Sequence, residues 1–403
     1  MMTTTHTALA HVAPASIAAP RSISIFGATG SVGASTLDLV RLDPGAYRVV
    51  ALTAQTQATE LAALAREFSA EVAVIGDPAQ HQALAAALAG TKTQVWSGPQ
   101  GLLDAADLDA DWTMAAIVGC AGLAPIMRSL LRGRCVALAN KEALVSAGAL
   151  MIEAAHTSGA TLLPVDSEHN AIFQCLAGGR IDEVESITLT ASGGPFRQWT
   201  LDQMRVAGPE QAVAHPNWSM GAKISVDSAT MFNKGLELIE AHHLFPVGLE
   251  NIRILVHPQS VIHSMVEYRD RSTLAQLGAP DMRIPIASAL GWPRRIVTNC
   301  APLDLATIGQ LTFEPLDDVR FPGPGICRAA IAAGGGAPAI LNAANEIAVS
   351  AFLGKRIGFL DIAAIVSQVL ARYSPSAPQS LQDVLGIDAE ARAEARCIIE
   401  AKD

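Results

Sequence analysis

The sequence predicts an α/β fold in three parts, and three patterns along the chain indicate it. From residue 21 to 165, apolar runs of strand length alternate with helical stretches, as in a parallel sheet covered by helices on both faces. Between residues 166 and 290 the strands lie closer together and show some polar alternation, which is typical of an α+β domain. From residue 326 the chain is rich in Ala with helical periodicity, which predicts a helical bundle.

These patterns place the expected elements and boundaries. In the first part, 21–165, we expect strands at residues 22–26, 47–52, 72–75, 114–118, 136–139 and 161–165, with helices at 34–41 and 59–68. In the second part, 166–290, we expect strands at 186–191, 252–256, 261–268 and 273–277, and a long irregular, mobile stretch at 192–221. Residues 1–20 are expected to be a disordered tail, 291–325 a linker rich in Pro and Asp turns, and 326–403 the helical domain.

Composition argues against several classes of protein. The 403 residues favour two or three domains, and 28 Lys and Arg against 38 Asp and Glu leave a net charge of −10, which argues against a nucleic-acid partner. The six Cys show no CxxC spacing, so zinc and dithiol sites are not expected. No apolar run predicts a membrane span, and the first residues lack the basic start of a signal peptide. We therefore expect a cytoplasmic protein with reduced thiols.

A glycine-rich turn follows the first predicted strand. The run Gly27-Ala-Thr-Gly30-Ser-Val-Gly33 opens the first helix. Glycines at this spacing let the backbone turn tightly and approach a dinucleotide pyrophosphate at a helix N-terminus. Its place on the first strand of an alternating series predicts a Rossmann-like, dinucleotide-binding domain. The alternative is a turn with a structural role alone.

Candidate metal ligands follow the last strand of that sheet. Residues 119–122, 140–142 and 166–169 each come directly after a strand, at the rim where such sheets bind ligands. Asp166 and Glu168 lie two apart in a segment expected to be extended, so that both side chains point to the same side. Neighbouring carboxylates repel unless a cation or a proton relieves them, and oxygen ligands suit Mg²⁺ or Mn²⁺. The alternative is a solvated acidic turn.

A third carboxylate and a phosphate site are expected on one helix at residues 228–240. Asn233 and Lys234 precede Glu237 by four and three residues, so the three side chains share a face, and Ser228 lies near the helix N-terminus. This arrangement predicts a phosphate site beside a metal that Glu237 helps to bind. The alternative is a Ser cap with a surface Lys234–Glu237 pair.

The loop at residues 215–221 is expected to cover a ligand. Trp218 and Met220 lie between Pro and Gly residues, which predicts an apolar lid that excludes water; the alternative is a loop anchored by a buried Trp. Ser192 and the two glycines after it offer a hydroxyl and amides to phosphate oxygens. His257 and His263 flank a strand turn and are more typical of core residues than of catalysts.

These motifs together resemble those of the 1-deoxy-D-xylulose 5-phosphate reductoisomerase family, from residue 21 to the C-terminus. The resemblance rests on the glycine run and on six longer blocks: Ala139–Glu142, Leu163–Phe173, Ser192–Phe196, His215–Glu237, His257–Ser264 and Asn342–Glu346.

The resemblance implies an activity, cofactors and partners. Family members isomerise and reduce 1-deoxy-D-xylulose 5-phosphate to 2-C-methyl-D-erythritol 4-phosphate, in the non-mevalonate route to isoprenoid precursors. They use NADPH and a divalent metal, Mn²⁺ or Mg²⁺, with Co²⁺ as a further candidate. In bacteria they are cytoplasmic homodimers that phosphonohydroxamates such as fosmidomycin inhibit. Their fold is a Rossmann-like NADPH-binding domain, an α+β catalytic domain with the lid, and a C-terminal helical bundle.

The resemblance also implies roles for the matching residues. The implied metal ligands are Asp166, Glu168 and Glu237, which form the catalytic set with Lys141. The implied substrate-binding residues are Lys141, Ser167, Glu168, Ser192, His215, Ser228, Asn233, Lys234 and Glu237. The implied cofactor contacts are Thr29, Gly30, Ser31, Val32, Asn140, Glu142 and Gly221, and the lid residues are Trp218 and Met220.

One block departs from the family pattern. After the second strand most members carry a Gly, a basic residue and an Asn, whereas this chain has Ala54-Gln55-Thr56-Gln57. We therefore do not assign to this chain the contact that family members usually make with the 2′-phosphate of the cofactor.

Two rival functions remain open. Semialdehyde dehydrogenases share a GxTGxxG start but need an activated thiol beside a base, and no Cys here lies in such a polar setting; Cys120 is nearest to the rim. A non-enzymatic dinucleotide sensor is the second rival, and metal-dependent turnover would exclude it.

Overall fold

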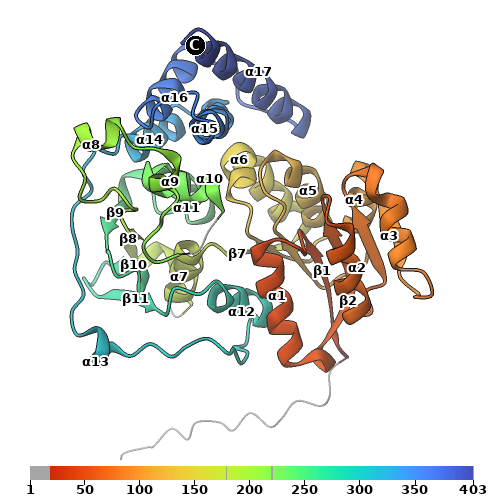
Figure 1. Cartoon of the computed structure of the whole chain (residues 1–403). Coiled ribbons are helices and arrows are strands. Elements are labelled where there is room, and N and C mark those ends of the chain that lie inside the picture. Colours follow the sequence, from red (N-terminus) through yellow and green to blue (C-terminus); the bar gives the residue numbers. More distant parts are fainter. Residues whose placement is uncertain (1–18, 178, 219–220, 403) are drawn as a thin grey trace, which may run out of the picture.

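Two β-sheets and a layer of C-terminal helices organise the chain (Figure 1). The computed structural model describes residues 19–177, 179–218 and 221–402. Most of the expected N-terminal tail, and Met220 of the expected lid, lie outside these residues. No helix within the described ranges has the length and apolar character that a membrane crossing requires.

The first sheet has seven parallel strands in the order β4-β3-β2-β1-β5-β6-β7, which confirms the predicted parallel sheet. The strands are β1 Arg21–Phe26, β2 Tyr47–Ala54, β3 Val72–Ile75, β4 Gln94–Ser97, β5 Trp112–Ala115, β6 Cys135–Leu138 and β7 Thr161–Pro164. The connecting helices are α1 Ser31–Leu42, α2 Ala58–Glu67, α3 His81–Ala87, α4 Gly98–Ala106, α5 Leu123–Leu131 and α6 Lys141–Ser158. Strand β4 was not predicted because its side chains are exposed or half-buried and form no apolar run.

The order of the strands reverses after β4. Strand β5 pairs with β1 on the side opposite β2, so Ile25 has Leu52 as one neighbour and Met114 as the other. Ligands of open α/β sheets bind beside such a reversal, at the carboxyl ends of the strands. The segments that follow β1, β5, β6 and β7 therefore mark the rim where a site is expected.

The second sheet has four strands in the order β11-β10-β8-β9. They are β8 Val184–Ala191, β9 Ile252–Val256, β10 Ile262–Tyr268 and β11 Thr273–Leu277, and all four were predicted. Helix α7 (Ser167–Leu176) leads into this sheet. Between β8 and β9 lie α8 Leu201–Arg205, α9 Pro209–Ala212, α10 Ala222–Ala229 and α11 Phe232–Leu244.

Three local predictions in this region are wrong. Residues 228–240 form the end of α10 and the start of α11 rather than one helix, because Met231 adopts a left-handed φ of 61° between them. Asp166 and Glu168 do not lie in an extended segment, since Asp166 caps the N-terminus of α7 and Glu168 lies in its first turn. The stretch 192–221 is not irregular throughout: it contains α8 and α9, whose Met204 and Ala212 are fully buried in a core shared with the C-terminal helices.

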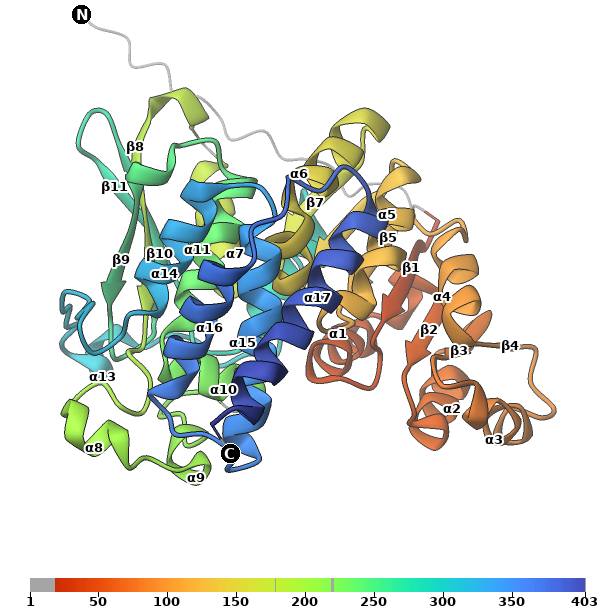
Figure 2. The ribbon, with the colours of Figure 1, turned by 90° about the horizontal axis from the view of Figure 1, so that it is seen from above.

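The last part of the chain packs on the first sheet and on helices of both sheet regions. Helix α12 (Arg283–Gly291) packs on the first sheet, where the indole Nε1 of Trp112 donates to the carbonyl of Ala289 at 3.1 Å. After the short α13 (Leu305–Ile308) come α14 Gly323–Ala333, α15 Ala337–Leu353, α16 Asp361–Arg372 and α17 Leu381–Glu400. These four helices form a bundle over α6, α10 and α11 (Figure 2), which ties the two sheet regions together.

Candidate functional site

A cavity of about 380 Å³ lies between the rim of the first sheet and the second sheet. It collects residues that lie more than 200 positions apart in the chain, from Ser31 to Met282. The predicted site residues that line it are Ser31, Val32, Lys141, Asp166, Ser167, Glu168, Ser192, His215, Trp218, Gly221, Ser228, Asn233, Lys234 and Glu237. The predicted dinucleotide turn and the predicted metal and substrate residues therefore open into one space.

The glycine run forms the turn between β1 and α1. Gly27 has a φ of +89°, and a Cβ there would lie 2.7 Å from the carbonyl oxygen of Ala116. A Cβ on Gly33 would lie 2.3 Å from the carbonyl oxygen of Gly27, so only glycine allows α1 to begin this close to the strand. The backbone at the N-terminus of α1 is thus open to the cavity, as a pyrophosphate requires.

Three of the predicted cofactor residues are held by other protein groups. The amide of Asn140 donates to the carbonyls of Ile117 and Gly119, at 2.6 and 2.9 Å, and so fixes the loop after β5. Glu142 accepts from Lys223 Nζ at 2.8 Å, and Thr29 Oγ1 donates to Gln57 at 3.0 Å. None of these three residues lines the cavity, and neither does Gly30. Their contact with a cofactor stays a prediction.

The three predicted metal ligands meet at one point. One oxygen from each of Asp166, Glu168 and Glu237 lies within 4.8 Å of the others. Lys141 Nζ forms an ion pair with Asp166 and lies 3.3 Å from Glu237 Oε1, while Lys234 Nζ pairs with Glu237 and lies 2.8 Å from Glu168 Oε1. The carboxylates converge because α7 begins directly against α11, and not because of alternation along an extended segment.

These groups shift one another's pKa. Burial, reinforced by the charge of Glu168, raises the pKa of Glu237 to about 7. Burial also opposes ionisation of Glu168, but the charge and the hydrogen bond of Lys234 outweigh it and lower the Glu168 pKa to about 2. Burial disfavours the charged form of Lys141, yet Asp166 and Glu237 raise its pKa well above the ordinary value. A divalent cation would relieve the repulsion between these crowded carboxylates.

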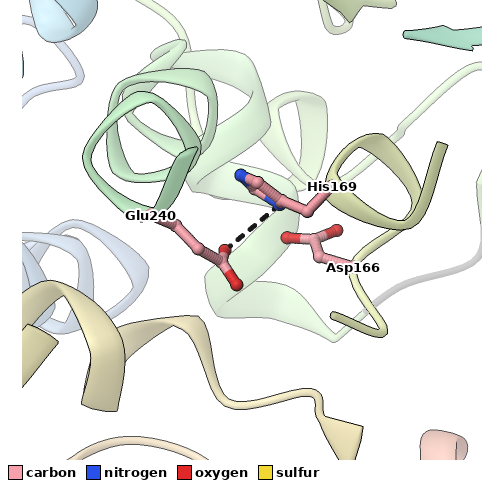
Figure 3. Close-up of side chains that lie close together, drawn as sticks. All are labelled: Asp166, His169 and Glu240. Carbon is pink, nitrogen blue, oxygen red and sulfur yellow. Dashed lines mark ion pairs between the residues drawn. The ribbon is translucent and has the colours of Figure 1, made fainter. Parts of the chain in front are cut away.

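Two buried residues beside this cluster were not predicted. His169 on α7 and Glu240 on α11 lie with Asp166 in a group whose ligand atoms are within 4.8 Å of one another (Figure 3). Burial raises the pKa of Glu240 to about 7, although His169 acts in the opposite direction. The sequence did hold a signal, since His169 follows Asp166, and Glu240 follows Glu237, by three residues, the spacing of neighbours on a helix.

A second polar region of the cavity wall is suited to bind an anion. His215 Nδ1 accepts the backbone N–H groups of Asn217 and Trp218, so Nε2 carries the hydrogen and donates to Ser192 Oγ at 2.9 Å. The same hydroxyl accepts from the N–H of Gly194 at 3.1 Å, which leaves its own hydrogen for an acceptor in the cavity. Burial lowers the pKa of His215, in keeping with a neutral ring.

The segment around Trp218 contacts the loop after β9. The indole lies 6.2 Å from the ring of His263, and Asn217 Nδ2 donates to the carbonyl of Pro258 at 2.7 Å. His263 is buried, and it also lines the cavity. His257 is the core residue that we expected, because its Nδ1 donates to the carbonyl of Thr312 at 2.9 Å.

Cys120 is not an activated thiol. Its Sγ donates to Asp388 at 3.3 Å, and burial, together with the charge of Asp388, raises the thiol pKa to about 12. A thiol with such a pKa is almost entirely protonated at neutral pH and is a poor nucleophile. This environment argues against a semialdehyde dehydrogenase mechanism.

Comparisons with known proteins agree with this geometry. Three family models match: 1-deoxy-D-xylulose 5-phosphate reductoisomerase over residues 23–148, its C-terminal domain over 162–245, and the DXP reductoisomerase C-terminal domain over 277–394. The chain is 56% identical to the enzyme of that name from Zymomonas mobilis, over 95% of this chain and 98% of the relative. It is 55% identical to the one from Rhodospirillum centenum, over 92% of each.

Solved structures agree as well. The Zymomonas mobilis enzyme in complex with NADPH superposes with a TM-score of 0.91 at 54% identity, covering 94% of this chain and 99% of the other. A DOX-P reductoisomerase in complex with NADPH, fosmidomycin and magnesium superposes with a TM-score of 0.89 at 44% identity, covering 94% and 98%.

Proposed function

This chain belongs to the 1-deoxy-D-xylulose 5-phosphate reductoisomerase family, and on that premise we propose that the cavity is the active site of this activity. The chain converts 1-deoxy-D-xylulose 5-phosphate to 2-C-methyl-D-erythritol 4-phosphate with NADPH and a divalent metal ion. The observation that carries the assignment is that the glycine turn and the three carboxylates open into the same cavity.

We propose Asp166, Glu168 and Glu237 as the metal ligands. Their donor atoms are all oxygen and lie close enough to share one ion, which suits Mg²⁺ or Mn²⁺, with Co²⁺ as a further candidate. The bound ion supplies Lewis-acid polarisation of the substrate's oxygen atoms. Ser167 holds one ligand in place, since its hydroxyl donates to Glu168 Oε2 at 2.6 Å.

The other cavity residues bind and orient the substrate. Lys141 and Lys234 neutralise the carboxylates, and a cation in that place would free both ammonium groups to donate to substrate oxygens. Ser192, with its hydrogen left for an acceptor, is placed to bind the phosphate, together with His215, Ser228 and Asn233.

The cofactor lies on the turn that ends at α1. NADPH supplies the hydride that reduces the rearranged substrate. The proposed contacts are Thr29, Gly30, Ser31, Val32, Asn140, Glu142 and Gly221, of which Ser31, Val32 and Gly221 line the cavity. Trp218 is proposed to exclude water from the reacting groups, and the same role is proposed for Met220, two positions later in the sequence.

We further propose a homodimer in the cytoplasm, with domains at 21–165, 166–290 and 326–403. Strand β11 is an edge strand with Leu274 48% exposed, and Val297 and Val319 of the following segment are 83% and 78% exposed. A second copy of the chain is the partner that would cover these exposed apolar side chains. The cysteines are free thiols, which fits a reducing compartment.

The activity is tested by following NADPH oxidation with 1-deoxy-D-xylulose 5-phosphate, with and without a chelator. Oxidation should require both the sugar phosphate and a divalent ion, and added Mg²⁺ should restore it after chelation. The matched variant Cys120→Ala should keep the parent rate. Chelator-resistant oxidation, or a loss of activity in Cys120→Ala, would contradict the proposed function.

A further inference from the structure

The backbone leaves its helical path at Met231, between α10 and α11 (Figure 1). Met231 has a left-handed backbone, with a φ of 61° and a ψ of 7°, which side chains other than Asn, Asp and His seldom adopt. This is not a surface turn, because Met231 is 2% exposed and lines the cavity. Strained backbone of this kind persists where the surrounding structure holds it, and it is concentrated at functional sites. The roles proposed above do not use Met231.

Neighbouring groups hold the backbone in this conformation. The N–H of Met231 donates to the carbonyl of Ser228 at 3.2 Å, which closes the last turn of α10. The carbonyl of Met231 accepts from the N–H of Lys234 at 3.1 Å, which begins α11. The start of α14 packs against the same turn, since a Cβ on Gly323 would lie 3.0 Å from the carbonyl oxygen of Thr230. The break is therefore fixed by the packing around it.

A continuous helix could not present the proposed site residues of this segment to one cavity. Successive residues of an α-helix are rotated by about 100° about its axis. Ser228 and Glu237, nine residues apart, would then point in directions about 180° apart, and Asn233 would point about 140° away from Ser228. In the structure all three residues line the same cavity, and so does Lys234. The break at Met231 is what makes this arrangement possible.

The end of α10 also meets the loop that follows β8. A Cβ on Gly194 would lie 2.7 Å from the carbonyl oxygen of Ser228, so only glycine allows this approach. The N–H of Gly194 donates to Ser192 Oγ at 3.1 Å. The two serines proposed to bind the phosphate are thus placed through one glycine, and the position of Ser228 depends on where α10 ends.

We propose that Met231 is a positioning residue for the reaction. Its left-handed backbone lets Ser228, at the end of α10, and Asn233, at the start of α11, reach the same substrate phosphate. Met231 acts through these residues and need not contact the phosphate. The proposal rests on the proposed function, because the phosphate is that of the same substrate.

The test compares variants of the full chain that differ in backbone preference at residue 231. Gly adopts the left-handed conformation freely, Ala favours a continuous helix, and the β-branched Val is strongly disfavoured at positive φ. KM for the sugar phosphate should be lowest in Met231→Gly, intermediate in Met231→Ala and roughly ten- to a hundred-fold higher in Met231→Val than in Met231→Gly. Packing alone predicts the opposite order, because Gly removes the most buried side-chain volume.

Two readouts distinguish positioning from a purely structural role. KM for NADPH should be the same in the three variants, since the cofactor turn lies on other elements. A structural role would lower the amount of folded enzyme, and with it kcat, without changing KM for the sugar phosphate. The Kd for inorganic phosphate, measured by isothermal titration, should follow the same order as KM for the sugar phosphate. Met231→Asn should resemble Met231→Gly, because Asn also tolerates the left-handed region.

The outcomes separate this proposal from the function. If the unaltered chain turns over the sugar phosphate but Met231→Gly has a KM equal to or above that of Met231→Ala, the role of Met231 is overturned and the proposed function stands. If the unaltered chain does not turn it over, the proposed function fails and the Kd for inorganic phosphate decides: tighter binding by Met231→Gly than by Met231→Ala supports positioning, and equal binding overturns it. If circular dichroism shows that Met231→Val does not fold, the pair of Gly and Ala variants, which differ by one methyl group, decides the question.

Discussion

Replacing Thr56 with Arg is expected to sharpen the preference of this enzyme for NADPH over NADH. In dinucleotide-binding domains the side chains that follow the second strand contact the ribose of the cofactor. A carboxylate there selects NAD, and a cationic side chain there selects NADP. Here Gln55, Thr56 and Gln57 are neutral, and Gln57 accepts a hydrogen bond from Thr29. NADPH therefore meets no repelling charge at this position, but it also meets no charged partner there.

The next basic side chain along the chain, Arg66, does not fill this gap. Its guanidinium donates to the carbonyl of Ala87 at 2.9 and 2.6 Å and to that of Ala89 at 2.9 Å, where it ties α2 to the end of α3. Three of its five N–H donors are thus committed to the protein. A charge-assisted hydrogen bond is worth about 1.5–3 kcal/mol, so the missing one corresponds to roughly a ten- to hundred-fold difference in cofactor preference.

The assay is kcat/KM for NADPH and for NADH, measured at one ionic strength in the parent and in variants. Thr56→Arg should raise the NADPH-to-NADH ratio by roughly ten- to a hundred-fold. Thr56→Met, a neutral control, and Arg66→Met should leave the ratio near the parent value, although Arg66→Met should unfold at a lower temperature. An unchanged ratio in Thr56→Arg, or a parent that already prefers NADPH by several thousand-fold, would refute the reasoning.

Three further predictions concern the lid, the phosphate and the stability at low pH. Amide exchange at residues 215–218 should slow when Mg²⁺ and fosmidomycin bind. Met204 is fully buried and serves as the control, since its amide should be protected with and without the ligands. Strong protection of residues 215–218 in the absence of ligand would contradict the lid. Ser228→Ala should raise KM for the sugar phosphate roughly five- to ten-fold and leave KM for NADPH unchanged, and equal rises in both would move the phosphate elsewhere. Hydrogen bonds from the side chain and backbone of Ser22 lower the pKa of Asp111, so this carboxylate stabilises the fold fully above its unfolded pKa of about 3.9 and less as pH falls through the lower folded value. The difference in Tm between the parent and Asp111→Asn should therefore shrink below pH ~4, and a constant difference would contradict the shift.

The parts of the fold that were predicted correctly depend on local sequence. The turn from Gly27 to Gly33 has a local cause, since a Cβ on Gly33 would clash with the backbone of Gly27 and Ala28, and the glycine spacing predicts it. The strands of both sheets except β4 were likewise visible as apolar runs. The break between α10 and α11 was not, because a Met in the left-handed region carries no signal comparable to Gly or Asn.

The parts that were missed depend on tertiary packing. His169 and Glu240 become neighbours only because α7 begins against α11, and neither helix alone shows that contact. The same is true of Lys223, which bridges Glu142 on α6 and Asp227 on its own helix at 2.8 Å each. The kinds of side chain that could bind a ligand could thus be predicted from the sequence, whereas the structure was needed to show which of them lie next to one another.

The assignment of Asp166, Glu168 and Glu237 as metal ligands is tested most directly by the turnover of Glu237→Gln. The side chain is fully buried and its carboxylate faces Lys141 and Lys234, so the amide keeps the size and removes one negative charge. We expect kcat to fall at least ~100-fold at ordinary Mg²⁺ concentrations, as for the loss of an electrostatic stabiliser, with the Kd for NADPH unchanged. Turnover near the parent value under those conditions would show that the metal is bound elsewhere.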